Sequence, residues 1–134
     1  LTRSSAASDV YKRQNKDRIE NIRRVAEITK LFVQTGHVVI TAFISPFKLN
    51  RTAAKEIISD NDFIEVFIDS SIEKCEERDV KGLYRKARSG EIMDFTGISS
   101  PYETPEKPDI YVDTNNFSIS ESTELLFKKL KVIL

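Results

Sequence analysis

The chain has 134 residues, 40% of them hydrophobic, with 21 basic and 21 acidic side chains and therefore no net charge. This composition suits one globular domain, excludes a disordered chain and argues against a general nucleic-acid binder. One cysteine, Cys75, and one histidine, His37, exclude a disulfide framework and argue against a zinc site or a metal centre built on these residue types.

The N-terminal segment differs from the rest of the chain. Residues 1–14 show no helical or strand periodicity and contain a cluster of Ser and Ala, which predicts a non-native or disordered leader over 1–15. No signal-peptide core and no apolar run of membrane-spanning length occur, so we expect a cytoplasmic protein that does not bind membranes. A foreign leader would replace the native N-terminus, which leaves organellar targeting open.

The first half of the remaining chain predicts two helices and two strands. Apolar residues at helical spacing predict a helix at about 17–35, with Asp17 and Glu20 as a variant capping box. The nearly continuous apolar run 38–44 predicts a strand buried on both faces. A helix at about 50–59 and a strand at 63–69 follow.

The second half predicts short helices, a basic segment and one more strand. Ser70 and Glu73 fit a capping box for a helix that ends near Arg78. A helical stretch at about 83–88 follows, and three prolines between 101 and 108 predict a stiff loop. A strand at 110–114 and a last helix that begins at Ser118 or Ser120 complete the chain.

This alternation of helices with buried strands predicts an α/β fold with a parallel sheet and flanking helices. Ligands of such folds bind beyond the carboxyl ends of the strands. In this chain those ends are Ser45, Asp69 and Asp113 with Thr114. Asp69 at a strand end could bind a metal, but we favour a role at the entry to the following helix.

Five basic residues between 78 and 88 suggest a flap that closes on phosphates. On a helix over 81–88, Lys81, Arg85 and Arg88 would share one face, opposite Leu83, Tyr84 and Ala87. Such cations stabilise the charge that spreads over phosphoryl oxygens. A solvated basic surface helix is the alternative.

Five strings make the sequence specific. They are DRIENIRRVAE (17–27), ITAFISPF (40–47), CEERDVKGLY (75–84), ARSGEIMDFTGI (87–98) and SPYETPEKP (100–108). Together they resemble the adenylylsulfate kinase (APS kinase) family, in register over about residues 16–134. The resemblance implies a P-loop NTPase-type fold with a lid at about 79–100. It also implies transfer of the γ-phosphoryl of ATP, with Mg²⁺, to the 3′-hydroxyl of adenylylsulfate, in sulfate assimilation.

The resemblance also assigns site residues. It implies that adenylylsulfate is bound by Arg18, Asn21, Ile44, Ser45, Lys81 and Phe95, with lid phosphate contacts from Arg78, Arg85 and Arg88. The family serine at Ser45 is associated with a phosphoserine intermediate. A nucleophilic serine needs a base, and His37 lies eight residues away, roughly 25 Å along a strand, so we expect Ser45 to bind substrate instead.

The chain departs from the family in its glycines. It contains only Gly36, Gly82, Gly90 and Gly97, so neither a glycine-rich phosphate loop nor the family's N-terminal third is present. We therefore expect a truncated domain that folds poorly and has no measurable kinase activity. Two alternatives stay open: another P-loop nucleotide kinase, and a non-catalytic domain that binds adenylylsulfate or a partner. Homodimer formation and fusion to an ATP sulfurylase are also left open.

Overall fold

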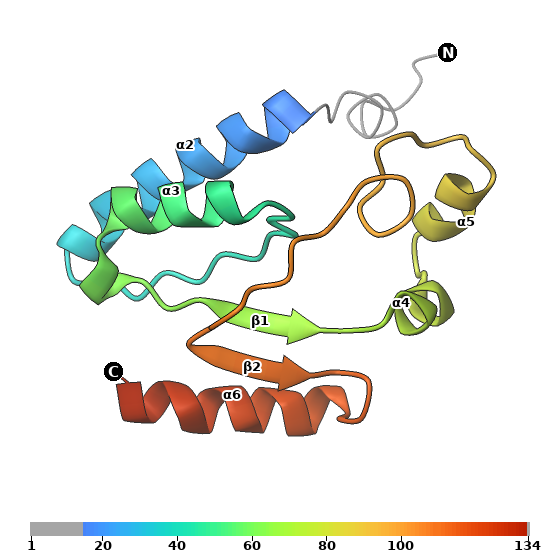
Figure 1. Ribbon diagram of the computed structural model, residues 1–134. Helices are drawn as coiled ribbons and strands as arrows, with labels where there is room; N and C mark the ends of the chain where they lie inside the picture. The colour runs from blue at the N-terminus through green and yellow to red at the C-terminus, as the bar shows by residue number, and fades with distance from the viewer. Residues whose placement is uncertain (1–14, 134) are drawn as a thin grey trace, which may run out of the picture. The chain divides into compact units, whose positions relative to one another are not determined.

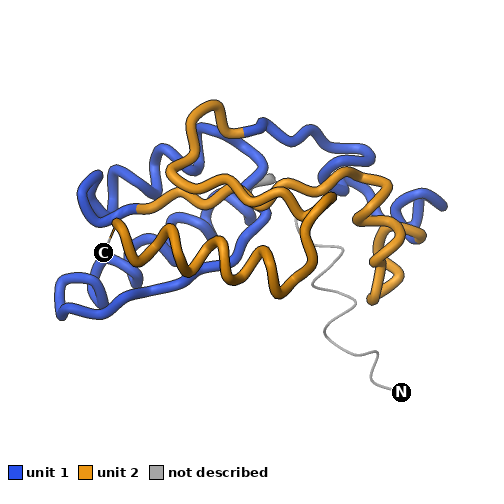
Figure 2. The backbone as a smooth tube through the Cα atoms, turned by 90° about the horizontal axis from the view of Figure 1, so that it is seen from below, with its two compact units in different colours: residues 1–63, 86–104 blue, residues 64–85, 105–134 orange. Residues whose placement is uncertain are grey.

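The computed structural model describes residues 15–133, so the predicted leader lies outside the described residues except for its last position (Figure 1). The chain divides into two compact units (Figure 2). Unit 1 comprises residues up to Phe63 together with Lys86–Thr104, and unit 2 comprises Ile64–Arg85 together with Pro105–Leu134. The predicted lid is therefore divided between the units, because the boundary falls inside one short helix.

Unit 1 is built on two packed helices. Helices α2 (Asn15–Gln34) and α3 (Lys48–Ile58) lie side by side, and a single 3-10 turn, η1 (Asp60–Asp62), follows α3 (Figure 1). These bounds confirm both helices expected from periodicity. The buried residues on α2 and α3 are small or polar, which allows the helices to approach closely: Ala26, Thr29, Asn50 and Ala54.

The apolar stripe of α2 is only partly covered. Ile19 and Phe32 belong to the stripe, yet they are 47% and 51% exposed. The helix also begins two residues before Asp17, so Asp17 lies in its first turn and the prediction that it caps the helix was wrong. Its supposed capping partner, Glu20, binds arginines of the same helix instead.

The predicted strand at 38–44 is wrong. This segment runs between α2 and α3 without strand assignment, and the sheet described in residues 15–133 contains two other strands only. Val38 is 72% exposed and Ile40 is 86% exposed. An apolar run becomes a buried strand only where neighbouring strands and covering helices are available, and the described residues supply none at this place.

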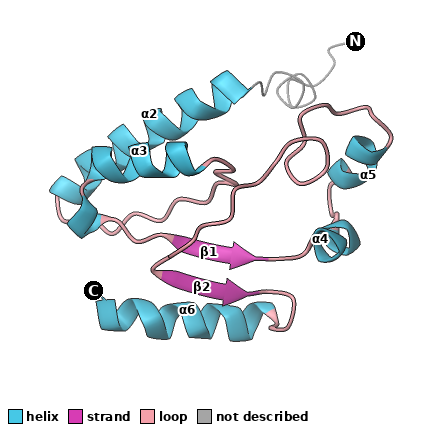
Figure 3. Ribbon diagram, in the orientation of Figure 1, coloured by secondary structure: helices cyan, strands magenta, loops and turns pink. Residues whose placement is uncertain are grey.

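Unit 2 contains a parallel pair of strands and a covering helix. Strand β1 (Val66–Asp69) pairs with β2 (Ile110–Asp113), and helix α6 (Ile119–Ile133) packs beside β2 (Figure 3). Both strands were expected, although β1 begins three residues later than predicted. Ile110 and Val112 are each 1% exposed and form the centre of this unit. The register aligns Asp69 with Asp113, so the two strand ends meet as the fold class requires.

Two short helices follow β1. Helix α4 (Ile72–Arg78) is capped by Ser71, whose hydroxyl accepts from the backbone N–H of Lys74, so the cap lies one residue beyond the predicted Ser70. Helix α5 (Leu83–Arg88) matches the prediction. The Asp79 carboxylate accepts from the backbone N–H groups of Tyr84 (3.1 Å) and Arg85 (3.1 Å), which otherwise lack partners in a first helical turn.

The last helix has a complete capping box. The Ser118 hydroxyl accepts from the backbone N–H of Glu121 (3.3 Å), and the Glu121 carboxylate accepts from the backbone N–H of Ser118 (2.8 Å). Ser118, and not Ser120, therefore starts α6. The Ser118 hydroxyl (2.6 Å) and the Ser118 backbone N–H both donate to the Glu121 carboxylate, and these hydrogen bonds lower the pKa of Glu121.

The capping box predicts a difference between two neighbouring serines. Ser118→Ala removes the cap of α6 and should destabilise the fold by about 1 kcal/mol, the usual cost of losing a serine cap. Ser120→Ala is the matched control, because this exposed residue lies inside the first turn. Urea unfolding followed by circular dichroism measures both variants. Equal midpoints for the two variants would contradict the assignment.

The Asp79 cap predicts that α5 depends on pH. Burial raises the pKa of Asp79, but hydrogen bonds from the backbone N–H groups of Arg85, Tyr84 and Leu83 outweigh it, so the net pKa is lowered. A lowered folded-state pKa stabilises α5 above the unfolded pKa of about 4, and this stabilisation is lost as pH falls through the folded value. The amide shifts of Tyr84 and Arg85 should therefore titrate with a midpoint below 4 in NMR spectra.

Asp79→Asn is the control for this titration. The amide oxygen can still accept a hydrogen bond, but the variant has no carboxyl group, so the shifts of both amides should lose their acid transition. A midpoint at or above that of an unfolded aspartate would contradict the cap.

Candidate functional site

The N-terminal part of α2 carries the first two predicted ligand residues, Arg18 and Asn21. Arg18 does not extend freely into solvent. Its guanidinium donates from Nη2 to the carbonyl of Asp94 (2.7 Å) and from Nη1 to the hydroxyl of Thr96 (3.0 Å). These contacts join segments 76 and 78 residues apart within unit 1. Arg18 is thus fixed beside another residue expected to bind adenylylsulfate, Phe95, which lies between its two partners in the sequence.

The loop that holds Phe95 is tightly closed. The Phe95 carbonyl accepts from the backbone N–H groups of Ile98, Ser99 and Ser100, at 3.1, 3.0 and 3.0 Å. The Ser99 hydroxyl accepts in turn from the Phe95 backbone N–H. Asp94 (φ 54°) and Gly97 (φ 86°) supply the left-handed turns that this closure requires. Phe95 is half-buried, so part of its side chain stays accessible.

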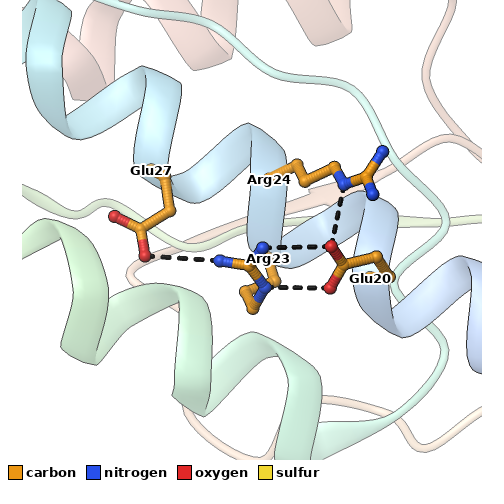
Figure 4. Close-up of polar contacts among 4 residues, drawn as sticks. All are labelled: Glu20, Arg23, Arg24 and Glu27. Atoms are coloured by element: carbon orange, nitrogen blue, oxygen red, sulfur yellow. Dashed lines mark hydrogen bonds and ion pairs between the residues drawn. The ribbon is translucent and has the colours of Figure 1, made fainter.

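Ion pairs organise the α2 surface next to Asn21 (Figure 4). Glu20 accepts from Arg23 (2.9 Å) and Arg24 (2.8 Å), and Arg23 also lies 3.5 Å from Glu27. Hydrogen bonds from these two arginines lower the pKa of Glu20 to about 2, so its carboxylate is charged at neutral pH. A hollow of about 250 Å³ lies over this turn, lined by Asp17, Glu20, Asn21 and Arg24.

Ile44 and Ser45 were expected at the carboxyl end of a buried strand. That strand does not form, so they lie on the irregular segment between α2 and α3, in which Ile44 is 62% exposed. Ser45 adopts a left-handed backbone conformation (φ 42°), and its carbonyl accepts from Arg51 Nη1 (2.7 Å). His37 is hydrogen-bonded to the Thr35 hydroxyl (2.9 Å) and packs edge-on against Phe32.

The lid residues before position 86 belong to unit 2. Arg78 donates to the carbonyl of Thr114 (2.7 Å) and contacts its hydroxyl (3.4 Å), which ties the end of α4 to the turn after β2. Lys81 is exposed in the turn before α5, so the expectation that it shares a helix face with Arg85 and Arg88 is wrong. The helix begins only at Leu83 because Gly82 takes a left-handed conformation (φ 65°).

Arg85 folds back toward this turn. Its Nη2 atom would lie 3.0 Å from a Cβ placed on Gly82, so a larger residue there would displace the end of this side chain besides straining the backbone at φ 65°. Arg88 is exposed in the part of α5 that belongs to unit 1. Cys75 is free and half-buried, and the Tyr84 hydroxyl contacts it. Burial of the Tyr84 hydroxyl is the larger cause and its contact with Cys75 the next, and together they raise the pKa of Tyr84 to about 12.

The paired strand ends do not make a metal site. The Asp69 carboxylate accepts from the Tyr111 hydroxyl (2.7 Å), and this hydrogen bond raises the pKa of Tyr111 to about 12. Asp113 accepts from Asn115 and Asn116 in the turn after β2. Within residues 15–133 no group of three His, Cys, Asp or Glu side chains could hold a metal ion. The sequence of these 134 residues has no glycine-rich loop for ATP phosphates.

The structure thus connects only part of the predicted site. Arg18 is joined to the loop around Phe95, whereas Ser45 is joined to Arg51, and Arg78 to Thr114. Asp94, Thr96, Arg51 and Glu103 were not predicted. Most of these contacts use main-chain carbonyls, which carry no sequence signal.

Among residues 15–133, every helix is too short or too polar to span a membrane.

Three comparisons with known proteins agree. A family model described as Adenylylsulphate kinase matches residues 4–113. The adenylyl-sulfate kinase of Staphylococcus epidermidis is 53% identical over 115 residues, which cover 86% of this chain and 58% of the relative. That of Acaryochloris marina is 57% identical over 105 residues, covering 78% of this chain and 51% of the relative. This chain therefore spans only a little over half the length of these two curated relatives.

A solved structure is similar as well. The APS kinase of Mycobacterium tuberculosis, in complex with AMPPNP and APS, superposes with a TM-score of 0.84 and 40% sequence identity. The superposition covers 94% of this chain and 73% of that one. The α/β architecture with a parallel sheet is therefore that of a P-loop kinase. By its sequence and its fold, the chain belongs to the adenylylsulfate kinase family.

Proposed function

We propose that this chain supplies the adenylylsulfate-binding part of an enzyme that phosphorylates the 3′-hydroxyl of adenylylsulfate with ATP. The observation that carries the proposal is the contact of Arg18 with the loop on both sides of Phe95. It unites a cation suited to the phosphosulfate group with an aromatic side chain suited to adenine. Family membership and the similar APS kinase, which was solved with APS bound, support the same substrate.

Each proposed ligand residue has a chemical role. Arg18 and Asn21 lie three residues apart near the start of α2, where the positive end of the helix favours anions. Ile44 and Ser45 contact the nucleotide from the irregular segment before α3. For Lys81 we propose substrate binding, and for Arg78, Arg85 and Arg88 phosphate contacts from the lid, as the family resemblance implies.

The nucleotide donor needs elements that these 134 residues do not contain. The β- and γ-phosphates of ATP are held by a glycine-rich loop with a lysine, and Mg²⁺ by a hydroxyl and a carboxylate. In the intact family enzyme ATP and Mg²⁺ are the donor and its metal. We therefore propose that the 134-residue chain by itself binds adenylylsulfate without releasing ADP.

Adenylylsulfate binding by the 134-residue chain tests the proposed function. Arg18→Ala should weaken binding roughly 10- to 100-fold in isothermal titration calorimetry, the usual cost of a lost hydrogen bond to a charged group. Arg23→Ala is the control, because it removes an arginine of the same helix that pairs with Glu20 and Glu27.

Several outcomes would overturn parts of this proposal. Equal weakening by Arg18→Ala and Arg23→Ala would remove Arg18 from the site. ADP release by the chain alone, in a coupled assay with adenylylsulfate, would show that the phosphate loop is dispensable. Binding of a nucleoside monophosphate in place of adenylylsulfate would favour another nucleotide kinase.

Ser45 is proposed to bind substrate and not to carry a phosphoryl group. In an enzyme that joins this chain to a glycine-rich phosphate loop, Ser45→Ala should keep activity within about tenfold, since only a neutral hydrogen bond is lost. No phosphoserine should form at position 45 with γ-labelled ATP. Complete loss of activity with adenylylsulfate still bound would instead support a covalent intermediate.

A further inference from the structure

The backbone at Ser45 needs support from its surroundings. Its φ of 42° lies in the left-handed region, which residues other than glycine rarely adopt. Such a conformation persists only where neighbouring contacts enforce it. The next residue, Pro46, is among the most completely buried side chains, so the strained position is anchored on one side.

Arg51 supplies one enforcing contact. It lies on the first turn of α3 and donates from Nη1 to the Ser45 carbonyl (2.7 Å) and from Nη2 to the Glu103 carbonyl (2.8 Å). The planar guanidinium therefore bridges two carbonyls from segments far apart in the sequence. The Tyr102 ring lies 6.0 Å from the guanidinium and limits its movement further.

Glu103 closes the arrangement from the other side. Its backbone N–H donates to the Pro46 carbonyl (2.8 Å), and its carboxylate accepts from the backbone N–H of Lys48, the first residue of α3. The N-cap residue of α3, Phe47, offers no side-chain acceptor, so a distant glutamate serves in its place. Every one of these residues belongs to unit 1.

We propose that Arg51 and Glu103 are positioning residues that hold the Ser45 backbone in its left-handed conformation and so set the affinity for adenylylsulfate. We call Arg51, Glu103 and the carbonyls of Ser45 and Pro46 the Ser45 clamp. The claim about affinity rests on the proposed function, in which Ile44 and Ser45 contact the substrate. The claim about the backbone does not depend on any ligand.

The ligand-free chain tests the backbone claim. Arg51→Ala should shift the Ser45 Cα and Cβ resonances and accelerate amide exchange of Glu103 by about tenfold, since about 1.4 kcal/mol of local stability is a factor of ten. Lys55→Ala is the control on the same helix, because its ammonium lies 3.4 Å from Asp60 and is not part of the clamp. It should change neither signal.

Two further variants keep the test informative if Arg51→Ala folds poorly. Arg51→Lys keeps the charge but cannot bridge two carbonyls, so it should give a weaker version of the same change. In the Ser45→Gly background, removal of Arg51 should perturb residue 45 less, because glycine adopts positive φ without support. A separate variant, Glu103→Ala, tests the other half of the clamp: it removes the acceptor for the Lys48 N–H, so it should shift the Ser45 resonances in the same direction as Arg51→Ala.

Adenylylsulfate titration completes the experiment. Arg51→Ala should weaken binding about tenfold, and Glu103→Ala should weaken it in the same direction, whereas Lys55→Ala should change it less than about threefold. Unchanged Ser45 resonances and Glu103 exchange in Arg51→Ala would refute the clamp. Changed resonances with unchanged affinity would refute its role in binding. Failure of the unmodified chain to bind would refute the proposed function, while the ligand-free signals still decide the backbone claim.

Discussion

Arginine side chains that donate to main-chain carbonyls hold the loops of this protein. Arg18 binds the Asp94 carbonyl, Arg51 binds the carbonyls of Ser45 and Glu103, and Arg78 binds that of Thr114. Each contact joins α-helical residues to an irregular segment. A guanidinium suits this task because its donors lie in one plane and stay charged at any physiological pH. Loops that would otherwise be held only by their ends are thereby fixed on the helices.

These contacts also change how the basic residues should be understood. Sequence reasoning treats an arginine near a phosphate site as a ligand for the phosphate. In this structure Arg18 and Arg78 already use some of their donor hydrogens in hydrogen bonds to protein oxygens. A guanidinium has five donor hydrogens, so structural and ligand contacts can coexist. Lys81 differs from these two arginines because its side chain is exposed. Its position in the turn is set by the backbone of Gly82 and by the Asp79 cap.

Local patterns predicted the regular elements well and their surroundings less well. Helical spacing identified α2 and α3, because this signal lies within a few residues of sequence. The start of α6 was left between Ser118 and Ser120, and the capping box in the structure decides for Ser118. The strand predicted at 38–44 was wrong. An apolar composition indicates that a segment favours burial, but it does not indicate which strand or helix would cover it. The cap of α4 was misplaced by one residue, since Ser70 and Ser71 differ only in backbone conformation and context.

The candidate site shows the same limit. The family resemblance implies that Arg18 and Phe95 bind substrate, and the structure places them next to each other. The resemblance could not indicate that Asp94 and Thr96 make the connection. A contact to a carbonyl can involve any residue type, so it leaves no trace in composition or spacing. The roles of Arg51 and Glu103 likewise required coordinates.

The segment between α2 and α3 has a practical consequence. Residues 38–44 read VVITAFI, which combines high β-propensity with no charge and no proline, and Val38, Ile40, Phe43 and Ile44 are all exposed. Segments of this kind pair with copies of themselves when they meet in solution. We therefore expect self-association at high protein concentration to start at these seven residues. Low concentration and a polar substitution at Ile40 are the rational measures for keeping the chain monodisperse.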